Sequence, residues 1–201
     1  LNSVIRNGAI DLSSVEINEG EIKNFEQIYI VACGSAYHVG VAAQYVLEDL
    51  VRIPVRVELA SEFRYRNPIL DKNGLAVIIS QSGETADSLA ALRECKSKGI
   101  RTLAVVNVVG SSIAREADNV FYTLAGPEIA VATTKAYSTQ LIAAYVLAIQ
   151  FAKVKGQIDD EQYTAYIEEL QTLPDKIQRI IDDKERLQWF ASKQANSRDV
   201  F

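Results

Sequence analysis

The sequence predicts an α/β domain built on a parallel β-sheet, and three observations support this class. Between about residues 27 and 125, short apolar runs rich in β-branched residues alternate with longer helical patterns, which is typical of βαβ units. Several of these runs are apolar throughout, as expected for strands covered on both faces. With 201 residues, of which 48% are hydrophobic, the chain can bury one sizeable core.

Five segments are expected to form strands, and four helical segments separate or follow them. The predicted strands are residues 27–33, 53–58, 75–80, 101–107 and 119–122. The predicted helices are residues 35–51, 60–65, 85–98 and 111–117. Gly99 is a suitable stop for the third helix, because glycine readily adopts the left-handed conformation common just after a helix.

The two ends of the chain differ from this central region. Beyond residue 130, helical periodicity covers residues 133–153, 159–181 and 184–195, whereas the first 24 residues carry apolar positions without a clear period. We therefore expect three parts. Residues 1–24 would be an N-terminal extension from an upstream linker, residues 25–155 the α/β domain, and residues 156–201 a helical annex.

The composition argues against several classes of function. The net charge is −5 and no basic stripe is present, so a nucleic acid is not expected as a partner. No run of about 18 apolar residues is available to cross a membrane, and the first residues lack the apolar stretch of a secretory signal. Cys33 and Cys95 have no paired spacing and no histidine cluster beside them. Neither a disulfide nor a metal site is expected, and a cytoplasmic location fits best.

Two junctions between a predicted strand and a helix hold the residues best suited to bind a ligand. In an open parallel sheet, ligands bind beyond the carboxyl ends of the strands, near unsatisfied N–H groups at helix N-termini. At the first junction the strand ends at Cys33 and Gly34, and Ser35 is placed to cap a helix that begins near Tyr37.

The second junction, Ser80-Gln81-Ser82-Gly83-Glu84-Thr85, is rich in neutral hydrogen-bond donors. Capping the following helix needs only one hydroxyl group, which would explain a single serine. Three hydroxyl groups, an amide and a glycine that lets N–H groups turn inward together indicate a phosphate pocket. The segment lacks the lysine of a P-loop, and Gly34 lacks the further glycines of a dinucleotide-binding motif. No nucleotide or other cofactor is therefore expected.

Four stretches of the sequence resemble the sugar isomerase (SIS) domains, and more narrowly the first SIS domain of the glutamine:fructose-6-phosphate aminotransferases. They are residues 30–37 (IVACGSAY), 58–66 (ELASEFRYR), 80–87 (SQSGETAD) and 131–137 (VATTKAY), in the order and spacing of that family. The resemblance runs over about residues 25–155. It implies a three-layer fold with a flavodoxin-like, five-stranded parallel sheet and additional C-terminal helices.

The resemblance also implies a ligand and its contacts. The phosphate of fructose 6-phosphate or glucosamine 6-phosphate would be bound by Ser35, Ser80, Gln81, Ser82 and Thr85. The sugar would face Cys33, Gly34, Val131 and Thr133. Many relatives carry Thr-Ser after the Cys-Gly pair, whereas this chain has Ser35-Ala36, so one hydroxyl contact is expected to be missing.

Full-length aminotransferases of this family combine an amidotransferase domain with two SIS domains, and the resemblance implies a homodimer active in hexosamine synthesis. Their acid/base glutamate, ring-opening histidine and imine-forming lysine belong to the second SIS domain, toward which residues 156–201 would lead. We therefore expect this chain to bind sugar phosphate without converting it. Two alternatives stay open: a regulatory sugar-phosphate sensor and a stand-alone phosphosugar isomerase.

A few further residues have chemistry that an isomerase could use, and each also has a structural explanation. The Glu84 carboxylate is expected to stabilise a helix N-terminus through the helix dipole. His38 is expected to be a packed or solvated neutral imidazole. Lys135 is a weak catalytic candidate, because it could equally form an ion pair with a neighbouring carboxylate. Cys33 is expected to line the pocket as an inert thiol.

The charged residues Glu62, Arg64 and Arg66 lie together in the second predicted helix or just after it. They could form a solvated face, an internal ion pair or a subunit contact. The sequence leaves these three roles open.

Overall fold

A parallel five-stranded sheet forms the centre of the computed structural model, which describes residues 3–127, 129 and 133–199. Its strands are β3 (Gln27–Ala32), β4 (Val55–Leu59), β5 (Gly74–Ser80), β6 (Arg101–Val106) and β7 (Asn119–Tyr122), in the spatial order β4-β3-β5-β6-β7. This is the flavodoxin-like order, in which the first strand along the chain lies between the second and the third. The predicted fold class is confirmed.

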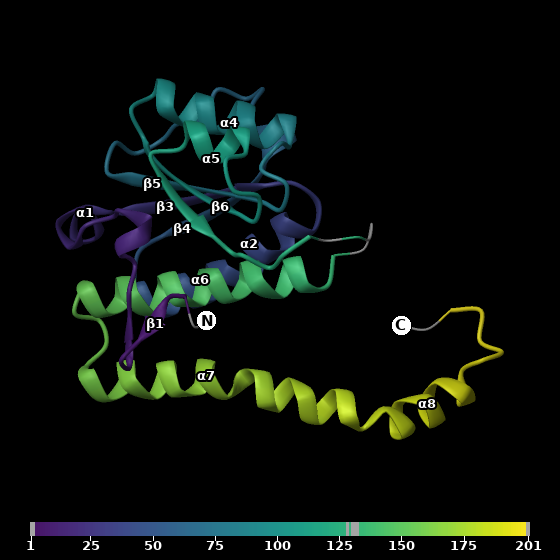
Figure 1. Ribbon diagram of the computed structural model, residues 1–201. Coiled ribbons are helices and arrows are strands. Elements are labelled where there is room, and N and C mark those ends of the chain that lie inside the picture. The colour runs from purple at the N-terminus through teal and green to yellow at the C-terminus, as the bar shows by residue number, and fades with distance from the viewer. Residues whose placement is uncertain (1–2, 128, 130–132, 200–201) are drawn as a thin grey trace.

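Helices cover both faces of the sheet (Figure 1). Helices α2 (Gly34–Val51) and α6 (Lys135–Val154) cover one face, and α3 (Ala60–Phe63), α4 (Ala86–Ser97) and α5 (Ser112–Glu116) cover the other. Along β5, Leu75, Val77 and Ile79 point to the α2/α6 side and Ala76 and Ile78 to the opposite side, as the period of two along a strand requires. The predicted three layers are therefore present.

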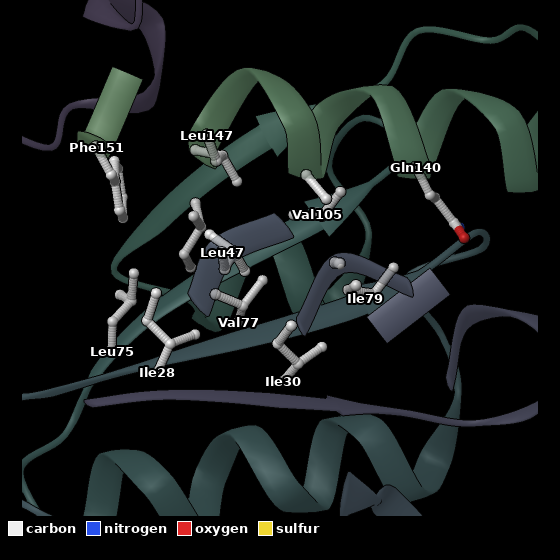
Figure 2. Close-up of a pocket in the computed structure, with 13 residues that line it drawn as sticks. Ile28, Ile30, Leu47, Leu75, Val77, Ile79, Val105, Gln140, Leu147 and Phe151 are labelled. Carbon is white, nitrogen blue, oxygen red and sulfur yellow. The ribbon is translucent and has the colours of Figure 1, made fainter. Parts of the chain in front are cut away.

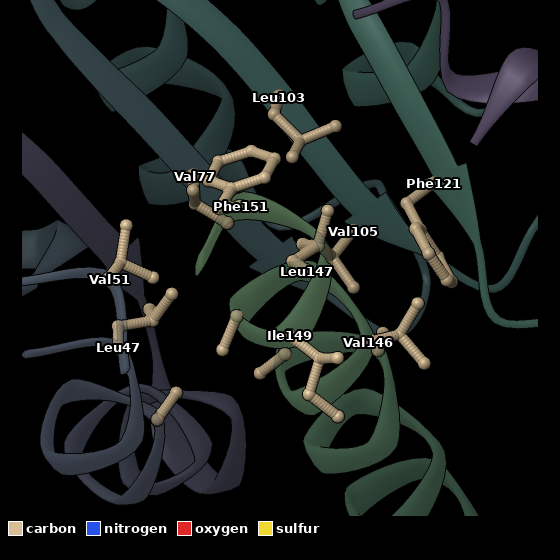
Figure 3. Close-up of a cluster of buried hydrophobic side chains, with 14 of the residues drawn as sticks. Leu47, Val51, Val77, Leu103, Val105, Phe121, Val146, Leu147, Ile149 and Phe151 are labelled. Carbon is tan, nitrogen blue, oxygen red and sulfur yellow. The ribbon is translucent and has the colours of Figure 1, made fainter. Parts of the chain in front are cut away.

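The larger core lies between the sheet and the α2/α6 layer. Its side chains enclose a cavity of only about 20 Å³ that is apolar except at Gln140 (Figure 2). Phe151, which is 1% exposed, lies among Val77 and Leu103 at this cavity (Figure 3), and its ring centroid is 6.2 Å from that of Phe25. Such close packing makes the core sensitive to any loss of side-chain volume.

The N-terminal residues fold into short elements that pack on the domain. These are the strands β1 (Ile5–Arg6) and β2 (Ala9–Ile10), the 3₁₀ helix η1 (Ser13–Val15) and helix α1 (Glu19–Asn24). The Asn119 side-chain amide donates to the Val15 carbonyl at 2.8 Å, and the Ile10 amide donates to the Tyr163 hydroxyl at 2.9 Å. Each element is too short to impose a hydrophobic period, which explains why the sequence pattern here was irregular.

Two helices, α7 (Asp160–Asp182) and α8 (Lys184–Lys193), form the helical annex (Figure 1). Ile167 and Leu170 of α7 are buried, whereas Trp189 and Phe190 of α8 are exposed. None of the helices among the described residues is long and apolar enough to cross a membrane.

Candidate functional site

A cavity of about 230 Å³ opens beyond the carboxyl ends of β3 and β5. This is the edge of a parallel sheet at which ligands bind. The described residues that line it are Cys33, Ser35, Ala36, Ile79, Ser80, Gln81, Ser82, Thr85, Thr133, Ala136 and Gln140. None of these lining residues carries a charge, and most of the polar ones offer a hydroxyl or an amide group.

Three helices, α2, α4 and α6, begin at this cavity. Their N-cap residues are Cys33, Thr85 and Thr134, and none of the three makes a side-chain capping hydrogen bond. Elsewhere among the described helices, α1 and α7 begin with a complete capping box, whereas α3, α5 and α8 also lack a side-chain cap. A helix N-terminus carries a partial positive charge and N–H groups without helical partners. The three helices that meet at the cavity therefore direct a positive potential toward it.

The segment that follows β5, residues 80–85, is held by its own hydroxyl groups. The Gly83 amide donates to the Ser80 Oγ at 3.1 Å, and the Ser80 Oγ lies 3.0 Å from the Thr85 Oγ1. The Glu84 amide donates to the Ser82 Oγ at 3.1 Å. Because the Ser80 and Ser82 oxygens accept these bonds, the Ser80 hydrogen can be donated to Thr85. The hydrogens of Ser82 and Thr85 then remain available for an anion.

Gly83 is the residue at which only glycine fits this segment. Its φ is +66°, and a Cβ atom built there would lie 2.0 Å from the Ser111 Oγ and 2.5 Å from the Ser111 Cβ. The Gly83 carbonyl accepts a hydrogen bond from the Ile113 amide at 3.0 Å. The chain of residues 80–85 is thus packed directly against the start of α5.

Glu84 has a structural partner outside the cavity. Its Oε1 accepts a hydrogen bond from the Ser112 amide at 2.7 Å, and this bond lowers the pKa of the Glu84 carboxyl group. The carboxylate therefore stabilises the first turn of α5. This agrees with a structural role at a helix N-terminus, although the helix is α5 and not α4, in front of which Glu84 lies in the sequence.

Most residues predicted to bind the ligand lie together at the cavity. Besides residues of the segment 80–85, these include Cys33, Ser35 and Thr133, and Ala36 lines the cavity beside them. Gly34 lies between them with φ +56°, and Val131 is outside the described residues.

One prediction at the first junction was wrong. Helix α2 begins at Gly34 with Cys33 as its N-cap, so Ser35 lies in the first turn and does not cap the helix. The positive φ of Gly34 allows the chain to turn into the helix earlier than a serine cap would.

Lys135 and His38, the other two candidates for proton transfer, are exposed and do not line the cavity. The imidazole of His38 contacts the ring of Tyr37 edge-on, with the ring centroids 5.4 Å apart. Nothing in this geometry gives either side chain a role in proton transfer.

The arginines near α3 form ion pairs. Arg64 pairs with Asp87 at 2.6 Å, and Arg66 pairs with Glu58. Asp87 lies in the first turn of α4 and Arg64 is the C-cap of α3, so this pair links the two helices. Each arginine thus forms a partly exposed ion pair with a residue outside the cluster, which leaves a subunit contact as an open alternative.

Sequence reasoning missed Gln140, which lines the cavity from α6 and is 3% exposed. A signal was present in the sequence. Gln140 lies at helical spacing between Ala136 and Ala144, two residues of the buried face of α6, so a polar residue interrupts an otherwise apolar stripe.

The two cysteines are expected to differ in reactivity, and because Cys33 is only half-buried, the inert thiol expected from the sequence is replaced here by an accessible one. Cys33 is half-buried at the cavity, whereas Cys95 is fully buried and its burial raises the pKa of its thiol to about 12. Iodoacetamide should therefore modify Cys33 and leave Cys95 intact in the folded protein, because only a thiolate reacts. Mass spectrometry of alkylated peptides measures this, and a Cys33→Ser variant should take up no label. Equal labelling of Cys95 would contradict the burial described here.

Comparisons with known proteins identify the family to which the chain belongs. The sequence profile of a family described as SIS domain matches residues 21–150. The chain is 54% identical over 198 residues to a glutamine–fructose-6-phosphate aminotransferase (isomerizing) of Caldanaerobacter subterraneus, covering 98% of this chain and 33% of that protein. A second such protein, from Methanosarcina mazei, is 46% identical over 96% of this chain and 31% of its own length. The chain thus spans about a third of these curated relatives.

A solved structure with a similar fold belongs to a protein of the same kind as these relatives. It is the C-terminal domain of glucosamine-fructose-6-phosphate aminotransferase from Francisella tularensis, with a TM-score of 0.91 and 36% sequence identity. The match covers 97% of this chain and 55% of that one.

Proposed function

Because the chain belongs to the SIS domain family, we propose that its cavity binds the phosphate group of a hexose 6-phosphate, either fructose 6-phosphate or glucosamine 6-phosphate. The observation that carries this proposal is the meeting of three helix N-termini, none capped by its own N-cap side chain, around a hydroxyl-rich segment. A phosphate dianion needs several donors and a positive potential, and neutral donors of this kind supply both.

The proposed phosphate contacts come from two strand ends. Ser82, Thr85 and the Gln81 amide would donate from the α4 side, and Ser35 would donate from the first turn of α2. Ser80, which is 3% exposed, would mainly hold the segment in place through its bonds to Gly83 and Thr85. In such a site, the dipoles of the peptide N–H and hydroxyl groups replace the water around the phosphate. These dipoles are already oriented before the phosphate binds.

The sugar would extend from the phosphate toward Cys33, Gly34, Val131 and Thr133. Cys33 and Thr133 line the cavity on the sides of α2 and α6. The sugar would then lie between the two helices that cover the same face of the sheet.

We further propose that the chain is the sugar-phosphate-binding part of the isomerase region of a glutamine:fructose-6-phosphate aminotransferase, a cytoplasmic homodimer of hexosamine synthesis. No carboxylate, imidazole or ammonium group belongs to the described residues that line the cavity. Moving a proton between sugar carbons requires such a group. The second SIS domain would provide it and the amidotransferase domain would provide ammonia, so this chain alone would not turn the sugar over.

The Ser82→Ala variant tests the phosphate site. Loss of a hydroxyl that donates to a charged phosphate should weaken the binding of glucosamine 6-phosphate by about 1.5–3 kcal/mol, or roughly 10- to 150-fold. Calorimetric titration of both proteins gives the two affinities. Ser97→Ala is a matched control, because Ser97 is exposed and lies at the opposite end of α4. Equal affinities of the wild type and Ser82→Ala would remove the phosphate assignment.

A further inference from the structure

Gln140 is a buried polar residue at the boundary between the apolar core and the cavity. It is 3% exposed and lines both the small apolar cavity and the larger polar one. Figure 2 shows its side chain projecting from α6 at the end of the apolar cluster where Ile79 lies, with Phe151 and Leu75 at the other end. The side chain therefore points to the same strand ends as the proposed phosphate site.

Some buried polar side chains of this protein have partners, whereas the hydroxyl groups of Ser88 and Ser111 and the Asn119 Oδ1 have none among the described residues. The Thr102 hydroxyl donates to Asp118 at 2.7 Å, and the Asn119 amide donates to the Val15 carbonyl at 2.8 Å. The carboxamide of Gln140 makes no hydrogen bond to any residue that the structure describes, and its polar atoms are not fully enclosed, because the side chain lines the cavity. A polar group on the wall of a cavity that has no partner in the protein is available to a ligand that enters the cavity.

The chemistry of a carboxamide selects among the groups of a sugar phosphate. A primary amide has an NH₂ group that donates hydrogen bonds and a carbonyl oxygen that accepts them. A sugar hydroxyl group can accept from the NH₂ group and donate to the carbonyl oxygen. A phosphate dianion only accepts, so it would leave the carbonyl oxygen of the amide unpaired. We propose that Gln140 recognises a hydroxyl group of the sugar once the phosphate is bound by residues 80–85. This inference rests on the proposed function.

The Gln140→Met variant separates recognition from a purely structural role, because methionine nearly conserves the length and volume of the side chain. We expect the affinity for glucosamine 6-phosphate to fall about tenfold, as for the loss of one neutral hydrogen bond. The affinity for inorganic phosphate should stay within about twofold. The melting temperature of the ligand-free protein should stay equal or rise, because an unpaired buried amide has been removed.

Calorimetric titration with glucosamine 6-phosphate and with inorganic phosphate, together with a thermal melt, gives these values. Gln171→Met is the control, since Gln171 is exposed on α7. Ser82→Ala removes a proposed contact to the phosphate group and should weaken the binding of both ligands. Gln140→Met should weaken only the binding of glucosamine 6-phosphate, and this difference separates the sugar contact from the phosphate contact.

Each other outcome has a definite meaning. Wild-type protein that binds neither ligand would overturn the proposed function and this inference together. Wild-type binding of both ligands with an unchanged sugar-phosphate affinity in Gln140→Met would overturn this inference alone. An equal loss of affinity for both ligands in Gln140→Met would mean that Gln140 contacts the phosphate group. A lower melting temperature with unchanged affinities would mean that Gln140 has only a structural role. Either result also overturns the inference.

A measurement on the wild type keeps the test valid if the variant does not fold. The side-chain amide resonance of Gln140 should shift on addition of glucosamine 6-phosphate and stay in place on addition of inorganic phosphate. A resonance that moves with neither ligand, or equally with both, would contradict the proposed contact.

Discussion

Replacing Gly83 with alanine is expected to weaken the binding of glucosamine 6-phosphate by at least about 100-fold. The new Cβ atom would lie 2.0 Å from the Ser111 Oγ and 2.5 Å from the Ser111 Cβ, far inside van der Waals contact. Alanine at this positive φ destabilises the native conformation of the segment by about 1–2 kcal/mol. Overpacking of this kind destabilises it by about a further 1–3 kcal/mol. Residues 80–85 would relieve the clash by moving away from α5, which displaces the donors of Ser82 and the neighbouring backbone.

Calorimetric titration measures this loss, and the chain offers a matched control. Gly99 also has a positive φ, of +75°, but no atom lies within 4 Å of a Cβ built there. Gly99→Ala should therefore lower the melting temperature slightly through backbone strain and leave the affinity for the sugar phosphate unchanged. Wild-type affinity in Gly83→Ala would mean that the shape of this segment does not determine binding.

Phe151→Ala should cause the largest loss of stability, with the free energy of unfolding reduced by about 3–5 kcal/mol. Phe151 is 1% exposed, contacts Phe25 and borders a cavity that already exists in the core. Removing the ring enlarges this cavity, and the sheet and α6 hold its walls apart. Urea unfolding followed by circular dichroism measures the change.

Phe190→Ala provides the comparison for the same substitution at an exposed site. Phe190 is 58% exposed on α8, so its removal should change the free energy of unfolding by less than about 0.5 kcal/mol. A similar loss in both variants would show that the effect of Phe151→Ala does not come from burial.

Much of the fold could be predicted from the sequence because the strands are covered on both faces. A continuous apolar run such as residues 75–79 is stable only where both of its faces are buried, which in this domain is the interior of the sheet. The predicted strand bounds lie within two residues of the observed ones. The N-terminal segment was less predictable. Its apolar residues, Val4, Ile10 and Val15 among them, are buried by contacts with distant parts of the chain, which leave no local pattern.

The site was predictable where it consists of neighbouring residues. The segment 80–85 carries its donors in sequence, so their number alone indicated an anion site. The cap proposed for Ser35 failed because the backbone of Gly34, and not a side chain, sets the start of α2. Gln140 was missed because its place at the site depends on a cavity that forms only when α6 packs beside α2 on the sheet.

The uncapped helix ends at the cavity also bear on how such a site can change during evolution. A substitution replaces a side chain, but it leaves the peptide N–H groups of a helix N-terminus in place as long as the fold is kept. A phosphate site of this kind is therefore inherited with the path of the main chain. On this view, the side chains at positions 35 and 36 can change at little cost, whereas a change at Gly83, which alters the backbone itself, would not be tolerated.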